Sequence, residues 1–575
     1  MHSRWLLPEP APELCSSLSK GLGISPVVAQ VLINRGISDA ASARAFLNPD
    51  LNDLADPDLL PGMAAAVNRI YEAARRKEKI LIYGDYDVDG TSATALLVRF
   101  FRLAGLDVEY YVPHRLEEGY GLNLEAISEF KRRGVRLIIT VDCGVNAVGE
   151  AEHAQAEGID LIITDHHEPG DQVAAACAVV DPKLTGSMHP YKELSGVGVA
   201  FKLAWAVAKQ FSEGRKMSEP FRQFLLNSLG LVALGTVADV VPLTGENRIL
   251  ARFGLPALGT ASGPGLLALI SCARIRNTRL TTRDVAFGLG PRLNAAGRMA
   301  EAALAIELML TDDGIRAVEI AGELESHNTE RRRLQEEAFE HAREMVLGQP
   351  DFESSRVIVL AHDSWHAGVI GIVASKLVEE FNRPAVMIAL DGAVGKGSAR
   401  SVHGFHLFNA LEGFSGRMMS FGGHAAAAGF LIAAEHIPAL REHLNQILAD
   451  AAPELFLPSL DVDAEILLSD LTERFVSELQ QLEPHGQANR PPLFLVHSLQ
   501  IAGRPRLMGA KGQHISFYVS DGSVSYRAVA FGMGEGIYDK ILAGARKCSV
   551  VFAAKTDTWN GTGELEVHVK DIEFE

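Results

Sequence analysis

The 575-residue sequence has few cysteines, and they are far apart. The five are Cys15, Cys143, Cys177, Cys272 and Cys548, and no two form a C-x-x-C pair. This spacing argues against a disulfide framework and against a zinc site, and it is typical of a reducing compartment. We therefore expect a cytoplasmic location.

Long apolar runs and positive charge are also scarce. No uninterrupted apolar run approaches membrane-spanning length, and the first residues lack the charged-then-apolar pattern of a signal peptide. With 54 Lys and Arg against 72 Asp and Glu, the net charge is −18. An acidic chain must gather its arginines locally if it binds phosphates, which disfavours a general DNA coat protein.

The most informative stretch is KILIYGDYDVDGTS, which begins at Lys79. An apolar, β-branched run leads into Asp85, Asp87 and Asp89, and Gly90 then allows a sharp exit. A buried strand, a turn and a helix open a βαβ unit, and ligands collect at the carboxyl ends of such strands. Carboxylates on alternate residues repel one another unless a cation, most suitably a hard divalent one, neutralises them.

Two other interpretations of this stretch compete with a divalent-metal site. A calcium loop of the EF-hand type needs a bidentate Glu at its twelfth place, which here is Leu96, so that interpretation fails. A solvated acidic turn that caps a helix stays open for this motif taken alone.

Two further strands are predicted to end in similar side chains. VRLIITVDCG ends in Asp142, and IDLIITDHH ends in Asp165, His166 and His167. Strands separated by helices predict a parallel sheet whose strand ends share one edge, so these clusters should meet. Neighbouring strand residues point to opposite faces, so we expect one histidine to bind metal and the other to face the substrate.

Asp239 stands alone in an apolar stretch, LVALGTVADVVPL. A buried carboxylate needs a partner or a metal, although helix-end amides could also satisfy it. The resulting candidate ligands are Asp85, Asp87, Asp89, Asp142, His166 and Asp239. Oxygen-rich ligation with one imidazole fits Mn²⁺ or Mg²⁺ better than zinc, and a set of this size can hold two ions. Two such ions can support phosphoester hydrolysis.

Arginines gather in one later stretch. Arg274, Arg276, Arg279 and Arg283 precede GLGPRLNAAGRM, which we interpret as a glycine-punctuated loop carrying Arg292, Asn294 and Arg298. An exposed arginine run is usually a solvated face, whereas arginine among glycines suits phosphate. The stretches GKGSARS and FGGHAAAAGF place small residues around Ser398, Arg400 and His424, which suits close approach of a charged backbone. For each of these two stretches alone, a tight hairpin is the favoured alternative.

The predicted fold class is α/β, with two α/β lobes joined by a long helix and a C-terminal OB-like β-barrel. The expected segments are an N-terminal helical appendage, a parallel-sheet lobe, a connecting helix, a second lobe and the barrel, at residues 1–60, 61–311, 312–347, 348–452 and 453–575. Aromatic residues of the barrel could stack bases or form its core.

The motifs GDYDVDG, VDCG and TDHH resemble those of the DHH (Asp-His-His) phosphoesterase superfamily, and FGGHAAAAG resembles its DHHA1 domain. Together with HRLEEGYGL, TVADVVPL, GPRLNAAGRM, SWHAGVIGIVASKL and the barrel, they are similar to the superfamily's single-stranded-DNA-specific 5′→3′ exonucleases. The resemblance implies a DHH catalytic domain at 61–311, a DHHA1 domain at 348–452, and two-metal hydrolysis that releases mononucleotides in DNA repair and recombination.

The resemblance also implies roles for single residues. One ion would be held by Asp85, Asp87 and Asp142, and the other by Asp89, Asp142, His166 and Asp239, with Asp142 bridging. His167 would contact the scissile phosphate or the leaving group, which makes His167 and Asp142 the expected catalytic residues. Arg115, Ser398 and Arg400 would bind the 5′-phosphate, Arg292, Asn294 and Arg298 would line the cleft, and His424 would touch the nucleotide. Asp85 stands where many members of the superfamily carry His.

The implied partners are single-stranded DNA with a 5′ end, a single-strand-binding protein and a RecQ-type helicase. Two other functions stay open. One is a DHH phosphoesterase for short oligonucleotides or cyclic dinucleotides, and the other is a replication scaffold that has lost catalysis.

Overall fold

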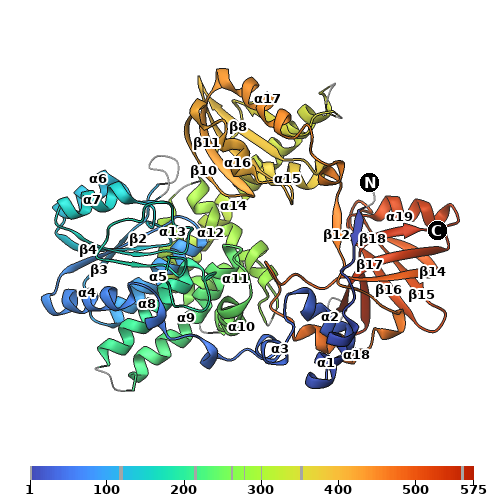
Figure 1. The fold of residues 1–575 in the computed structure, drawn as a ribbon, viewed down its shortest axis with the longest axis horizontal. Helices are drawn as coiled ribbons and strands as arrows, with labels where there is room; N and C mark the ends of the chain where they lie inside the picture. The colour runs from blue at the N-terminus through green and yellow to red at the C-terminus, as the bar shows by residue number, and fades with distance from the viewer. Residues whose placement is uncertain are drawn as a thin grey trace. The chain divides into compact units, whose positions relative to one another are not determined.

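A computed structural model describes residues 3–114, 121–212, 216–260, 263–277, 279–299, 301–349, 352, 354–557 and 563–575 (Figure 1). The chain forms two compact units. The larger comprises Asp56–Asp239 and Gly254–Leu457, and the smaller comprises Met1–Ala55, Val240–Phe253 and Pro458–Glu575. The five segments predicted from the sequence are a finer division and stay a prediction.

The larger unit begins with the predicted parallel sheet. Its order is β3-β2-β4-β5-β6, and the strands are β2 (Lys79–Gly84), β3 (Val108–Tyr111), β4 (Val135–Val141), β5 (Asp160–Thr164) and β6 (Ala178–Val180). The register pairs Gly84 with Val141, Val141 with Thr164, and Thr164 with Val180. Four strands therefore end level with one another at the same edge.

Helices cover both faces of this sheet (Figure 1). Apolar side chains of α6 (Leu124–Arg132) and α7 (Val148–Ala156) form a core with one face. The other face is covered by α4 (Met63–Arg76), α5 (Val88–Leu103) and α8 (Gly196–Phe211), and α9 (Glu219–Ala238) packs on α5 and α8. The parallel sheet is thus buried between helical layers, as the near-continuous apolar strands predict.

The helix α9 is long and apolar enough to cross a membrane by length and composition, and two bent helix pairs would qualify if each were one span. In the folded chain, 61% of its most apolar 18-residue window is buried. Packing against the neighbouring helices therefore accounts for its hydropathy.

The described elements between α9 and the connecting helix are all helices: α10 (Gly245–Thr260), α11 (Pro264–Cys272), the π-helix η3 (Asp284–Leu289), α12 (Gly290–Met299) and α13 (Ala303–Leu310). The predicted glycine-punctuated loop at 288–299 is therefore wrong. Pro291 suits the first turn of α12, and the glycines serve close packing instead of loop geometry. A Cβ on Gly297 would lie 2.7 Å from the carbonyl oxygen of Tyr86.

The connecting helix is α14 (Gly314–Leu347), close to the predicted range. A second sheet follows in the order β10-β11-β9-β8-β7, with β7 (Ile358–His362), β8 (Ala385–Asp391), β9 (Val394–Arg400), β10 (Met418–Gly423) and β11 (Ala427–Ala433). Its helices are α15 (Ile370–Phe381), α16 (Leu407–Glu412) and α17 (Ile437–Ile447). The two glycine-rich stretches are β9 and the β10–β11 hairpin, so the favoured hairpin interpretation is right for FGGHAAAAGF.

The smaller unit contains the C-terminal barrel. The strands β14 (Phe494–Met508), β15 (His514–Ser520), β16 (Ser525–Ala530), β18 (Leu565–Phe574) and β17 (Lys547–Thr556) follow in that order, and β14 also pairs with β17 to close the barrel. Shorter elements are α18 (Glu473–Gln480), α19 (Gly534–Leu542), β13 (Ala464–Glu465) and the parallel pair β1 (Arg4–Leu6) and β12 (Ser459–Asp461). The helices α1 (Pro12–Leu22), α2 (Pro26–Asn34) and α3 (Ala40–Leu47) share one hydrophobic core with the barrel. Phe517 lies in that core, whereas Tyr518 is exposed.

Candidate active site

Four aspartates follow the level ends of the parallel strands. Asp85, Asp142, Asp165 and Asp181 come directly after β2, β4, β5 and β6, and all four are buried. Because these strands end in register, the carboxylates are brought to one edge of the sheet, as the sequence predicts for the first three. The fourth, Asp181, is a strand-end residue that the sequence reasoning did not single out.

Asp142 has an unusual backbone conformation. Its φ is 63°, in the left-handed region that a residue with a side chain rarely adopts. Gly196 is packed against its carboxylate, since a Cβ on that glycine would lie 2.6 Å from Oδ1. The strained turn and the absent side chain at Gly196 together set the position of the Asp142 carboxylate.

Asp87 and Asp89 have different environments on α5. Asp87 is the N-cap of this helix, and its Oδ1 accepts hydrogen bonds from the amides of Asp89 and Gly90. The acidic turn therefore does cap a helix, without excluding metal binding by the second oxygen. Asp89 is fully buried, and its carboxylate accepts hydrogen bonds from the amides of Gly196 at 2.6 Å and Val197 at 2.9 Å. The N-terminus of α8 thus stabilises the ionised form of Asp89.

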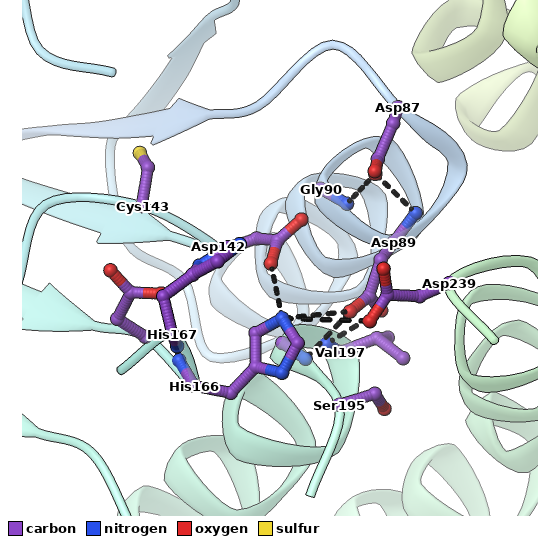
Figure 2. A network of polar contacts seen from close by, with 12 residues as sticks. Asp87, Asp89, Gly90, Asp142, Cys143, His166, His167, Ser195, Val197 and Asp239 are labelled. Atoms are coloured by element: carbon purple, nitrogen blue, oxygen red, sulfur yellow. Dashed lines mark hydrogen bonds and ion pairs between the residues drawn. The ribbon is translucent and has the colours of Figure 1, made fainter. Parts of the chain in front are cut away.

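Asp239 is the C-cap of α9, at the end of the apolar helix that the sequence showed only as an apolar stretch. Its carboxylate faces the ring of His166, together with the carboxylates of Asp89 and Asp142 (Figure 2). The distances from His166 Nε2 are 3.0 Å to Asp142, 3.6 Å to Asp239 and 3.9 Å to Asp89. Residues from four separate parts of the chain therefore converge on one point.

The charge and the hydrogen bonding of the His166 ring show whether these residues fit a cation. Burial, and then the neighbouring His167, lowers the pKa of His166 to about 3, so its imidazole is neutral at physiological pH. Its buried Nε2 has no hydrogen-bond partner among the described residues. A neutral imidazole nitrogen can act as a metal ligand, and the carboxylate oxygens that face it can bind the same ion. These residues therefore fit a divalent cation.

Three groups of side chains have ligand atoms that all lie within 4.8 Å of one another: Asp85, Asp87 and Asp142; Asp89, His166 and Asp239; and Asp142, His166 and His167. The donor set is rich in oxygen and contains no cysteine, which suits Mn²⁺ or Mg²⁺. Asp142 belongs to two of the groups, so its carboxylate is placed where it could serve two ions.

The carboxylates of this cluster repel one another. Burial, followed by the charge of Asp87, raises the pKa of Asp89 to about 7, although the two α8 amides oppose the shift. Burial also raises the pKa values of Asp142 and Asp239 well above the usual range, and neighbouring carboxylates raise them further. The metal-free cluster therefore holds extra protons at neutral pH, and a bound cation would replace them.

Asp165 positions the second histidine. Its Oδ1 accepts hydrogen bonds from the amides of His166 and His167 and lies 2.7 Å from His167 Nδ1. Burial lowers the pKa of His167, but the hydrogen bond and charge of Asp165 outweigh burial and leave that pKa raised. His167 is half-buried, whereas His166 is buried. Both lie beyond the end of β5, with their ring centroids 4.6 Å apart, so the expectation that they point to opposite faces as neighbouring strand residues is wrong. The sequence reasoning did not include Asp165 among the site residues.

The residues expected to line the cleft lie on α12. The guanidinium of Arg292 is buried, with its Nε 2.6 Å from Glu325 and a hydrogen bond donated to the Gly288 carbonyl. Asn294 Oδ1 accepts a hydrogen bond from the amide of Val88 at the start of α5. Both side chains therefore have structural contacts that the sequence did not reveal.

The remaining substrate candidates lie in the second α/β region. Arg400 Nη1 donates a hydrogen bond to Ser398 Oγ at 3.0 Å, and a Cβ on Gly371 would lie 2.9 Å from both side chains. This brings the pair to the first turn of α15, where free amides can bind an anion. Arg298 donates a hydrogen bond to the Gly368 carbonyl, close to the same helix. His424 is exposed between β10 and β11, and Arg115 lies outside the described residues.

Three family models match the chain: the DHH family N-terminal domain at residues 79–236, the DHHA1 domain at 354–450 and the RecJ OB domain at 462–571. The chain is 39% identical over 571 residues to the single-stranded-DNA-specific exonuclease RecJ of Bacillus subtilis, covering 99% of this chain and 70% of the relative. It is 32% identical to the RecJ of Escherichia coli, covering 96% of each chain.

Solved structures agree with these matches. The Thermus thermophilus RecJ in complex with Mn²⁺ superposes with a TM-score of 0.84 at 31% identity, covering 99% of this chain and 79% of that one. The same protein in complex with Mg²⁺ gives a TM-score of 0.78 at 30% identity, over 99% and 78%. With its in-register acidic strand ends, its second α/β region and its closed barrel, this chain belongs to the RecJ family.

Proposed function

We propose that the chain is a metal-dependent exonuclease that hydrolyses single-stranded DNA from its 5′ end and releases mononucleotides. The observation that carries the proposal is the convergence of Asp89, Asp142 and Asp239 on the unpartnered Nε2 of His166. The two RecJ relatives compared above are single-stranded-DNA-specific exonucleases by name, and two of the matching structures are complexes with Mn²⁺ or Mg²⁺.

Under this proposal, Asp85, Asp87 and Asp142 hold one Mn²⁺ or Mg²⁺ ion. A second ion is held by Asp89, Asp142, His166 and Asp239. Bound divalent ions lower the pKa of a coordinated water and stabilise charge on a phosphodiester. The His166 imidazole is already neutral, whereas the crowded carboxylates would release their extra protons when a cation binds.

His167 contacts the scissile phosphate or the leaving group in this proposal. Because Asp165 raises its pKa, the ring carries a proton near neutral pH more readily than a free histidine does. A protonated His167 can donate a hydrogen bond to a phosphate oxygen, and Asp165 holds the ring in the required orientation through Nδ1.

We propose that Arg115, Ser398 and Arg400 bind the 5′-phosphate and that His424 touches the nucleotide. Of these residues, Ser398 and Arg400 lie beside the first turn of α15. Arg298 and Asn294 line the cleft. Arg292 forms an ion pair with Glu325, so its role in the cleft would be to hold α12 in position. We further propose a cytoplasmic location and a role in DNA repair and recombination, with a single-strand-binding protein and a RecQ-type helicase as partners.

A time course on three substrates tests the function: 5′-phosphorylated single-stranded DNA, its 5′-hydroxyl form and a blunt duplex, each with and without Mn²⁺. We expect mononucleotides from the phosphorylated single strand in the presence of Mn²⁺, slower release from the 5′-hydroxyl form and little release from the duplex. Asp142→Ala should abolish release, and Asp160→Ala, which changes an exposed strand residue away from the cluster, should not. Metal-independent turnover, or release of long fragments only, would contradict the proposal.

A further inference from the structure

A surface of four arginines and one phenylalanine lies outside the site described above. We call Arg274, Arg276, Arg279, Arg283 and Phe287 the arginine surface. All five side chains are exposed. Residues 273–290 contain four arginines and only one acidic residue, Asp284, which gives a net charge of +3 in a chain whose net charge is −18.

The four arginines lack ion pairs within the described part of the chain. The side chains of Arg274, Arg276 and Arg279 have no polar partner there, and Arg283 contacts only the ring of Phe287, at 5.6 Å. The one carboxylate of the segment, Asp284, accepts hydrogen bonds from Asn277 and Thr281 instead. Asp284 thus stabilises the segment before η3 and does not neutralise the guanidinium groups, which stay available to an external anion.

Many other exposed arginines of the same unit are neutralised. Arg132 pairs with Glu129, Arg222 with Glu219, and Arg333 with Glu330 and Glu337. Among the described residues, isolated exposed arginines without an ion pair also occur, such as Arg75 and Arg136, whereas residues 274–283 bring four of them together in an acidic protein. Phosphate groups are the anions that guanidinium groups bind best, and a cluster of this charge concentrates them locally.

Phe287 adds an apolar element to this charge. Its side chain is 70% exposed, although it lies on η3 between two residues that are fully buried, Val285 and Leu289. Residues two apart on a helix point to nearly opposite faces, so Phe287 faces away from the core that Val285 and Leu289 enter. An exposed aromatic ring beside arginines is the combination on which single-stranded nucleic acids stack their bases.

The arginine surface is continuous with the elements of the candidate active site. The side chain of Ile275 packs on Gly288, where an added Cβ would lie 3.0 Å away, so the arginine segment is fixed on η3. At the next turn, a Cβ on Gly290 would lie 3.6 Å from Ala238, the residue before Asp239. η3 then continues directly into α12, which carries Asn294 and Arg298. α12 therefore joins the arginine surface to the residues expected to line the cleft.

We propose that the arginine surface binds the part of a single-stranded DNA substrate that lies beyond the catalytic cleft, with phosphates against the arginines and a base on Phe287. This inference rests on the proposed function, since it assumes that the 5′ end occupies the cleft. The surface holds the substrate between successive cleavages and leaves the chemistry at the metal cluster unchanged.

The test compares the wild-type chain with a variant carrying Arg274→Ala, Arg276→Ala, Arg279→Ala and Arg283→Ala, and with Phe287→Ala alone. Rates are measured in Mn²⁺ on a 5′-phosphorylated tetranucleotide and on a long single strand, and binding of the long strand is measured against salt in EDTA. We expect the four-arginine variant to bind the long strand about tenfold more weakly and to lose up to ~3 from its salt slope, at ~0.7 per phosphate contact. Phe287→Ala should weaken binding about fivefold with the salt slope unchanged.

The control variant carries Arg132→Ala, Arg222→Ala and Arg333→Ala, which removes positive charge from ion-paired positions of the same unit. It should bind the long strand like the wild type. Equal losses in the control and test variants would overturn the inference in favour of a general charge effect, and so would unchanged long-strand binding in the test variant. Failure of the wild type to cleave even the tetranucleotide would instead count against the proposed function.

Discussion

The metal cluster makes one prediction that can be worked out in sign and size. Asp142→Asn removes one charge from the group of carboxylates around His166 while keeping a similar shape. Asparagine tolerates the left-handed backbone at this position, where φ is 63°, better than most residues do. The substitution therefore tests the charge of Asp142 with little change to the turn after β4.

The effect on stability should reverse when metal is added. In the metal-free protein, ligand atoms of neighbouring carboxylates lie within 4.8 Å, a separation at which like charges repel by ~3 kcal/mol at an effective dielectric constant of ~20. Partial protonation relieves some of this repulsion, so we expect metal-free Asp142→Asn to be more stable than the wild type by roughly 1–3 kcal/mol. With Mn²⁺ at a hundred times its Kd, the wild type gains ~2.7 kcal/mol, which the variant largely loses.

The assay is thermal unfolding with and without Mn²⁺, together with exonuclease rates. Asp142→Asn should have a higher melting temperature than the wild type in EDTA, and an equal or lower one in saturating Mn²⁺. Its exonuclease rate should fall by more than ~100-fold, which is the upper end for residues that contact a metal ligand without binding the metal. Asp181→Asn is the matched control, because Asp181 is a buried strand-end carboxylate outside the three candidate metal groups. Equal stabilisation of wild type and Asp142→Asn by Mn²⁺ would refute the reasoning.

Three further predictions concern other parts of the structure. Asp165→Asn should lower the pKa of His167 and shift the pH–rate profile to lower pH, while Mn²⁺ still stabilises the fold; an unchanged profile would remove His167 from the mechanism. Because burial and Asp87 raise the pKa of Asp89 to about 7, its contribution to metal-free stability is present below pH ~4 and lost as pH rises through 7. The melting-temperature gain on adding Mn²⁺ should therefore grow between these values, and a pH-independent gain would be inconsistent with proton displacement. Arg248→Met should unfold the smaller unit at least ~3 kcal/mol more easily, since the buried Arg248 guanidinium donates to five carbonyl oxygens that would lose their donor. Limited proteolysis would detect that loss, and unaltered cleavage of tetranucleotides would show that the active site is intact.

The sequence by itself determined the parallel sheet and most of the candidate metal cluster. Apolar strands that end in Asp85, Asp142 and Asp165 could be recognised because strand periodicity and the level ends of parallel strands are local consequences of residue type. The proposal of two-metal chemistry rests on the number of carboxylates, and the barrel followed from its short alternating strands.

The tertiary structure alone decided how the side chains around this cluster are used. No sequence pattern indicates that the α8 amides bind Asp89 or that Glu325 pairs with Arg292, because each contact joins residues distant along the chain. The helical form of residues 290–299 was also hidden, since glycines that permit a loop equally permit close packing on Tyr86. Local residue preferences can specify a strand and the charge at its end, whereas the partner of that charge depends on packing between elements that only the folded chain brings together.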